Sequence, residues 1–295
     1  HLSIRRQRQM CIRDRAILGF ASGFLTPIFT STGQGNHVSL FSYYLVLNLA
    51  IASIGYHKSW RPLNVLGFGF TFIIGTLWGA SSYAPQHFAT TEPFLIIHFL
   101  LFTLIAVLYA HRQATKVSDY VDATLVFGTP IVGFSLQYAL LKNSPFGMAY
   151  SALALGIFYI GLAWWVLTRK RETMQFLGEC FVALGVGFAT LALPLALDGR
   201  WTSAAWSVEG VGLLWVGLRQ KRTFPLLSGL SLQLLAAMAF LYGWGLTGHN
   251  DFANQNMFLG AMFIALSGWA CGALLNHFNS NKMVSDLLAA WGWLW

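Results

Sequence analysis

Charged residues are scarce in this sequence. Only 9% of its 295 residues are charged, whereas 56% are hydrophobic, and a soluble domain carries about a quarter charged residues. This excludes an ordinary water-soluble globular protein. The sequence also lacks the recurrent alternation of apolar and polar residues that transmembrane β-strands show over about ten positions. The remaining class is all-α, a polytopic transmembrane helix bundle.

Cysteines and catalytic motifs are scarce as well. Cys11, Cys180 and Cys271 are isolated thiols, so no disulfide framework or zinc ribbon is indicated. There is no G-x-S-x-G turn, and the glycine-rich stretch 67–69 lacks the Lys-Ser/Thr of a phosphate loop. The sequence therefore predicts no cofactor. It leaves enzymatic activity open, because a membrane transferase can use a single carboxylate or histidine.

Long apolar runs fill the rest of the chain. Read between polar breaks, they predict nine complete membrane spans at 38–56, 63–83, 94–110, 123–141, 148–167, 177–197, 202–218, 225–246 and 257–276, with truncated spans at 16–30 and 287–295. The short connections make successive helices antiparallel neighbours. We expect residues 16–295 to form one transmembrane domain, a piece of a longer chain.

The first fifteen residues, HLSIRRQRQMCIRDR, are strongly basic and adjoin the first apolar run without a turn. They resemble translated sequencing-adaptor read-through, so residues 1–15 are set aside as a non-native scar. The alternative is a genuine basic flank on the cytoplasmic side.

Lysine and arginine predict the orientation, because cytoplasmic loops retain positive charge. One set of alternate loops, at 57–61, 111–122, 168–175, 219–224 and 277–286, holds eleven of these residues, whereas the opposite set holds only Lys142 and Arg200. The first set is therefore expected in the cytoplasm. The net charge of +8 falls to +4 without residues 1–15, and this remainder is used for topology. The expected partners are the lipid bilayer and the rest of the chain's own protein, not nucleic acid.

Glycine and proline mark packing and bending within the spans. Three pairs with the G-x-x-x-G spacing, at 19/23, 75/79 and 268/272, predict close helix approach. Pro130 and Pro194 are expected to kink their helices. Such kinks can open a transport site, although membrane helices also tolerate proline for packing alone.

Glu209 is the most informative polar residue, because it lies half way along the span 202–218. Inserting a carboxylate at that depth of the membrane costs a few kcal/mol unless it is paired, protonated or in contact with water. Helical spacing puts it on one face with Trp201, Ala205 and Gly212. The alternative to a functional site is a carboxylic acid hydrogen-bonded to a neighbouring helix.

Other polar residues are placed where they can join Glu209. Asp198 and Arg200 lie in the outer turn before its span, where a surface ion pair is the simpler interpretation. His98, Gln137 and Asn48 lie in the outer halves or near the midplane of their own spans. Together the six predict a polar pocket open to the outside, and singly each is a hydrogen-bonding group between helices.

Three histidines in the segments expected to face outward are candidate metal ligands. His37, His87 and His249 have Glu92 and Asp251 nearby. No H-x-x-x-H pattern or cysteine pair accompanies them, so no metal site is predicted.

Two segments carry a family resemblance. They are Gly23-Phe24-Leu25-Thr26-Pro27 and the turn Leu197-Asp198-Gly199-Arg200-Trp201-Thr202, which is followed by Trp206, Glu209-Gly210 and Leu214-Trp215-Val216-Gly217-Leu218-Arg219. From Ala16 onward the chain resembles the bacterial predicted membrane proteins of the domain of unknown function 2339 family. The resemblance implies an inner-membrane location and many further helices, and it brings no assigned activity.

Three functions remain open on this evidence. The first is transport or handling of a lipid-linked or envelope substrate through the outward pocket, with the proline-kinked spans as moving parts. The second is a cell-envelope glycan or acyl transferase that uses Glu209 or Asp198 as general base. The third is a non-catalytic membrane scaffold, for which a dry, packed bundle is expected.

Overall fold

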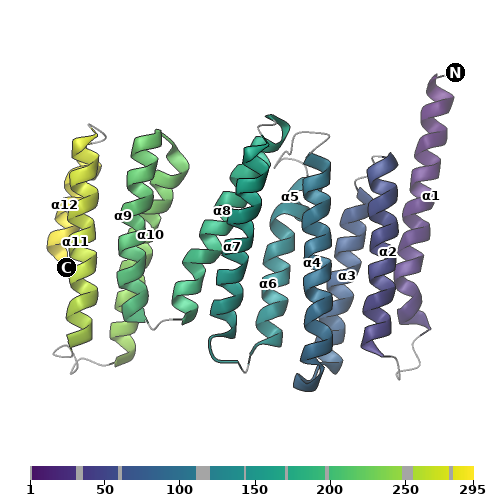
Figure 1. Cartoon of the computed structure of the whole chain (residues 1–295), viewed down its shortest axis with the longest axis horizontal. Coiled ribbons are helices and arrows are strands. Elements are labelled where there is room, and N and C mark those ends of the chain that lie inside the picture. Colours follow the sequence, from purple (N-terminus) through teal and green to yellow (C-terminus); the bar gives the residue numbers. More distant parts are fainter. Residues whose placement is uncertain are drawn as a thin grey trace. The chain divides into compact units, whose positions relative to one another are not determined.

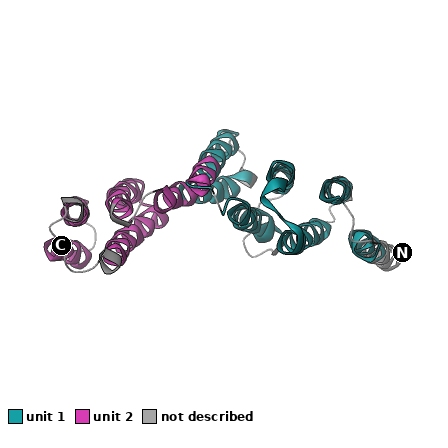
Figure 2. Cartoon of the chain, turned by 90° about the horizontal axis from the view of Figure 1, so that it is seen from below, with its two compact units in different colours: residues 1–145, 155–186 teal, residues 146–154, 187–295 magenta. Residues whose placement is uncertain are grey.

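The protein is seen in a computed structural model that describes residues 2–30, 36–58, 62–110, 120–142, 144–169, 172–196, 199–247, 255–278 and 282–295. Every regular element in these ranges is a helix (Figure 1). Contacts divide the chain into two compact units (Figure 2). Unit 1 comprises residues 1–145 and 155–186, and unit 2 comprises residues 146–154 and 187–295.

Unit 1 is built from the first helices of the chain. These are α1 (Leu2–Phe29), α2 (His37–Lys58), α3 (Pro62–Ser82), the 3₁₀ turn η1 (Pro85–His87), α4 (Phe88–Ala110), α5 (Tyr120–Ala123), the π-helical turn η2 (Thr124–Gly128) and α6 (Thr129–Leu140). Helix α2 packs against α1, α3 and α4, and α4 packs against α6. Most of α7 (Gly147–Thr168) and the first part of α8 (Glu172–Ala196) complete the unit.

Unit 2 contains the remaining helices, α9 (Gly199–Gln220), α10 (Thr223–Thr247), α11 (Gln255–His277) and α12 (Lys282–Leu294), with the end of α8 and the start of α7. Helix α9 packs against both α10 and α11, and α11 packs against α12. The turn after α9 is tight, because Lys221 has a positive φ of 53° and the N–H of Arg222 donates to the carbonyl of Gly217. This is the hydrogen bond of a Schellman ending.

Each apolar run predicted as a span coincides with a helix. Seven helical stretches among the described residues are long and apolar enough to cross a membrane: α2, α3, η1 with α4, α5 through α6, α7, α8 and α10. The all-α, multi-pass fold is therefore confirmed. The count of nine complete spans stays a prediction.

Some predicted boundaries are wrong, because the helices extend past the apolar runs. The segment 84–93 is not a loop: η1 begins at Pro85 and α4 at Phe88, so Glu92 is helical and half-buried. Asp122 was assigned to a cytoplasmic loop but lies in α5 with 6% of its surface exposed. Arg200 lies in the first turn of α9 and not in the preceding turn. Hydropathy marks the apolar middle of a helix, whereas its backbone hydrogen bonds continue into the polar flanks.

The two proline positions differ. The π-helical turn η2 comes directly before the Thr129-Pro130 start of α6. A wider turn accommodates the missing N–H of a proline and its clash with the preceding turn. Pro194, in contrast, lies two residues before the end of α8, so only the end of that helix follows it.

The three G-x-x-x-G pairs have different outcomes. A Cβ on Gly268 would lie 3.0 Å from the backbone of Gly292, and one on Gly272 would lie 3.0 Å from the carbonyl oxygen of Ser285, so this pair packs α11 on α12 as predicted. At Gly23 the nearest side chain is 3.9 Å away, an ordinary contact. Gly75 and Gly79 instead line a cavity in unit 1. For the first two pairs, close approach was the wrong expectation.

Candidate functional site

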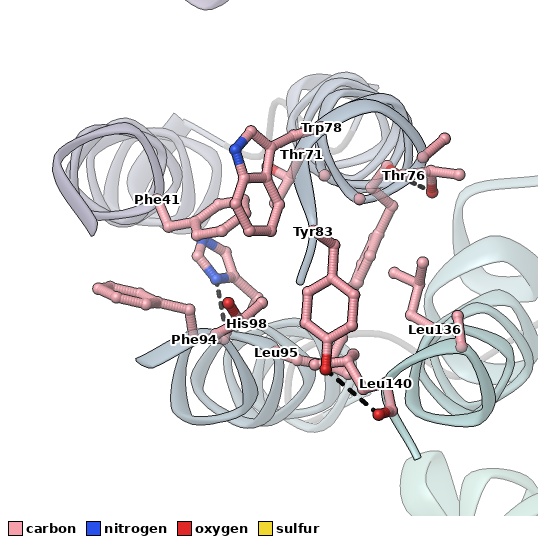
Figure 3. A pocket seen from close by; sticks show the side chains of 16 residues that line it. Phe41, Thr71, Thr76, Trp78, Tyr83, Phe94, Leu95, His98, Leu136 and Leu140 are labelled. Atoms are coloured by element: carbon pink, nitrogen blue, oxygen red, sulfur yellow. Dashed lines mark hydrogen bonds between the residues drawn. The ribbon is translucent and has the colours of Figure 1, made fainter. Parts of the chain in front are cut away.

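A cavity of about 290 Å³ lies inside unit 1, among α2, α3, α4 and α6 (Figure 3). Its wall is mostly aromatic and aliphatic, with Phe41 from α2, Phe72 and Trp78 from α3, Phe94 and Leu95 from α4, and Leu136, Ala139 and Leu140 from α6. The polar side chains on the wall are Thr71, Thr76, Tyr83, Thr91 and His98. The volume of the cavity and its mostly apolar lining are typical of a binding site for a small, largely apolar ligand.

Helix α3 leaves room for this cavity because it carries glycine on the facing side. Gly75 has only the ring of Phe41 within reach of a Cβ, at 3.9 Å, and Gly79 has no atom of the described chain within 4 Å. Between these two glycines, Trp78 packs edge-on against Phe41, with ring centroids 5.2 Å apart. The glycines that predicted close packing therefore form an open wall.

His98 is the polar residue of the wall that is buried most deeply, with 3% of its surface exposed. Its Nδ1 lies 2.8 Å from the carbonyl oxygen of Phe94, one turn earlier on α4. A carbonyl only accepts, so Nδ1 carries the hydrogen and the Nε2 of the neutral ring is an acceptor. Nε2 is buried and has no hydrogen-bond partner in the described chain. In Figure 3 the ring lies beside Phe41 and Trp78.

Thr91 is the second buried group on the wall with an unused atom. Its Oγ1 has no partner among the described residues, and the side chain is 8% exposed. Several other hydroxyls in these helices donate to a carbonyl three or four residues back, as Thr76 does to Phe72 at 2.6 Å. Thr91 is thus left with a donor and an acceptor for a ligand or water.

Asn48 is hydrogen-bonded to Thr71, which lines the cavity. Its Nδ2 donates to Thr71 Oγ1 at 2.6 Å, and the two side chains are 1% and 5% exposed. Because the amide is the donor, the hydroxyl hydrogen of Thr71 remains to be donated elsewhere. Gly67 lies directly against the Asn48 amide, where any Cβ would collide with Oδ1.

Gln137 does not line the cavity itself, although its neighbour Leu136 does. Its hydrogen-bond partner was not predicted from the sequence. Its Nε2 donates to Glu92 Oε1 at 2.7 Å, and so joins α6 to α4. Close by, the Tyr83 hydroxyl donates to the carbonyl oxygen of Leu140 at 3.2 Å. Burial, and next the charge of Glu92, raises the pKa of the Tyr83 phenol. The phenol therefore stays a neutral donor at ordinary pH.

His37 and His87 lie close together at the end of unit 1 where α2 and α4 begin. His37 Nε2 lies 2.7 Å from Thr90 Oγ1, and the His37 ring is 4.9 Å from that of His87 and 5.0 Å from that of Trp78, centroid to centroid. Within the described ranges, no three His, Cys, Asp or Glu residues come together to hold a metal ion. His249 and Asp251, the other candidates, lie outside those ranges.

Glu209 lies in unit 2, on α9. Thr190 of α8 donates to its Oε1 at 2.6 Å, and the Trp206 indole donates to the carbonyl oxygen of Thr190 at 3.1 Å. Glu209 is half-buried, and Trp201 and Gly212 of the same face are exposed. The carboxylate is therefore hydrogen-bonded to a neighbouring helix.

The structure brings together three of the six predicted pocket residues. Asn48, His98 and Gln137 belong to unit 1 and lie on or next to its cavity, whereas Glu209 belongs to unit 2. Asp198 lies outside the described residues, as does the side chain of Arg200. A single pocket of all six stays a prediction.

Two buried amides, Gln233 and Asn64, were not anticipated from the sequence. Gln233 of α10 donates to the carbonyl oxygen of Ser207 at 2.9 Å and accepts from Ser267 Oγ at 3.0 Å, which ties α9, α10 and α11 together. Asn64 of α3 donates to the Tyr109 hydroxyl of α4 at 2.7 Å. A lone amide inside an apolar run was the available signal, since it is the signal that singled out Asn48.

Comparison with known proteins agrees with this architecture. A family profile described as "Predicted membrane protein (DUF2339)" matches residues 14–295. The searches of curated proteins and of solved structures gave no match. With seven apolar helices of spanning length in its described part and a match over nearly its whole length, the chain belongs to the DUF2339 family of predicted membrane proteins.

Proposed function

We propose that this protein handles an amphipathic envelope molecule by binding its apolar part in the cavity of unit 1. The observation that carries the proposal is the wall of that cavity: aromatic and aliphatic side chains surround two buried polar atoms, His98 Nε2 and Thr91 Oγ1, that have no partner in the described chain. Buried polar atoms are normally paired. Unpaired ones on a cavity wall are expected where a ligand supplies the partner.

The cavity is expected to open to the outside of a bacterial inner membrane. It lies toward the end of unit 1 at which α2 and α4 begin and α3 and α6 end. The connections at that end carry little Lys and Arg, whereas those at the opposite end are rich in both. The positive-inside rule supports an outward-facing mouth on this basis. An aromatic-lined mouth there would admit molecules from the outer leaflet.

Binding is favoured over the two alternatives. A scaffold needs no cavity. A transferase needs an acid and a base near its substrate, and the cavity wall carries one histidine and no carboxylate among its described residues. Glu209, the proposed base of a transferase, accepts a hydrogen bond from Thr190, which suits a structural carboxylic acid. Transport remains the extension of binding in which α6 moves at the π-turn before Pro130.

The test is photocrosslinking with a diazirine-bearing dodecyl chain in purified, detergent-solubilised protein, followed by peptide mapping. We expect adducts on cavity residues, competed by excess dodecyl compounds, and lost in Gly79→Leu because a leucine there fills the cavity. Gly69→Leu is the matched control, since Gly69 is on the same helix with no described atom within 4 Å of a Cβ and does not line the cavity. Adducts confined to lipid-facing residues such as Ile73, which is 60% exposed, and unchanged in Gly79→Leu would refute the proposal.

A further inference from the structure

The hydrogen-bonding groups of the cavity form a pattern that selects the ligand's polar group. His98 Nε2 is an acceptor, because the ring hydrogen on Nδ1 is used by the carbonyl of Phe94. The Thr71 hydroxyl keeps its hydrogen for donation, because Asn48 Nδ2 donates to its oxygen. The cavity thus offers one acceptor from α4 and one donor from α3, which complement a group that both donates and accepts.

These two groups belong to the deep part of the cavity. Thr71 lies eleven residues before Ser82, the last residue of α3, a rise of about 17 Å. His98 lies seven residues beyond Thr91 on α4, so the two share one face of that helix at different depths. Between Thr91 and His98 on α4, the residues that line the cavity are Phe94 and Leu95, and both are apolar. A polar group of the ligand would therefore be buried, with its chain directed along an apolar wall.

Charge on the ligand is disfavoured at this depth. The sixteen described residues that line the cavity include no lysine, arginine, aspartate or glutamate. A phosphate or carboxylate placed there would be a buried charge without a counter-ion, which costs several kcal/mol. The charge of Glu92, which acts on Tyr83 of the cavity wall, would repel an anion further. The polar group must be neutral.

We infer that the cavity takes a neutral long-chain alcohol, whose hydroxyl donates to His98 Nε2 and accepts from Thr71. A ketone or ether accepts but cannot donate, and leaves the histidine unpaired. A carboxylate or phosphate carries charge that the wall cannot balance. This inference rests on the proposed function and narrows it to one class of head group, so the experiment separates the two.

The experiment is competition against the dodecyl photoprobe by dodecanol, dodecyl methyl ether and dodecyl phosphate, each at matched free concentration. Dodecanol is expected to compete about tenfold better than the ether, the effect of one buried hydrogen bond with its partner otherwise unsatisfied. Dodecyl phosphate is expected to compete least. An ether as potent as the alcohol, or a phosphate more potent than either, overturns the inference while the binding proposal stands. No competition by any of the three overturns both.

Variants locate the preference on the protein. In His98→Phe the alcohol and the ether should compete equally, and His98→Gln should restore part of the preference because its amide oxygen accepts. Ser135→Ala is the control: Ser135 of α6 does not line the cavity, and its hydroxyl donates to the Ile131 carbonyl, so the preference should remain. A preference unchanged in His98→Phe, or lost in Ser135→Ala, contradicts the assignment of His98.

Discussion

The contact between α9 and α10 gives the sharpest quantitative prediction. A Cβ on Gly217 would lie 2.5 Å from the backbone nitrogen of Leu226, and one on Gly229 would lie 2.6 Å from that of Leu214. Both obstacles are backbone atoms, so no side-chain rotation relieves them. Gly217→Ala and Gly229→Ala therefore force the two helices apart.

The size of the effect follows from the overlap. Restoring an ordinary contact of at least 3.4 Å from 2.5 Å requires a separation of about 1 Å, and overpacking of this kind costs about 1 to 3 kcal/mol. Gly212 of α9 has no described atom within 4 Å of its Cβ position. Gly212→Ala should gain up to about 1 kcal/mol of helix propensity without that packing cost. Because both substitutions gain the same helix propensity, the two alanine variants of α9 should differ by the packing cost, about 1 to 3 kcal/mol.

Cys271 provides the readout, because it is fully buried and packs against Leu214 in the core of unit 2. In a Cys11→Ser, Cys180→Ser background it is the remaining thiol, and its rate of maleimide labelling in detergent reports local opening. Since 1.4 kcal/mol corresponds to a factor of ten, a difference of about 1 to 3 kcal/mol predicts that Gly217→Ala labels at least about fivefold faster than Gly212→Ala. Rates within threefold of each other would refute the packing argument.

Three further predictions concern other parts of the chain. Glu209→Gln should keep the thermal unfolding midpoint within about 2 °C, because the amide oxygen still accepts from Thr190; a normal growth phenotype would show that Glu209 does not titrate in function. Gly67→Ala should lower the midpoint by several degrees, since its Cβ collides with the buried Asn48 amide, and a wild-type midpoint would contradict this packing. A reporter fused at Pro145 should read outside, as the Lys and Arg bias predicts, whereas a cytoplasmic signal would overturn the orientation.

Some polar contacts could be anticipated from the sequence and others could not. Asn48 and His98 were singled out because a polar side chain in an apolar run must find a partner, and both are buried on or beside the cavity. Glu92 was not expected to pair with Gln137, because the sequence predicts a loop at a position that α4 already includes. Its bond to Gln137 joins residues 45 positions apart, and no local pattern indicates such a pair.

The sequence alone determined the helical class and the apolar middle of each spanning helix, as for the span predicted at 38–56 and observed at His37–Lys58. The reason is physical: a bilayer offers no hydrogen bonds, so every apolar run must satisfy its own backbone as a helix. The tertiary structure alone decided which faces meet. Gly75 and Gly79 line a cavity, whereas Gly268 and Gly272 close a contact. The G-x-x-x-G spacing is the same in the two pairs. The outcome differs because the side chains of the facing helix determine whether the space beside a glycine is filled.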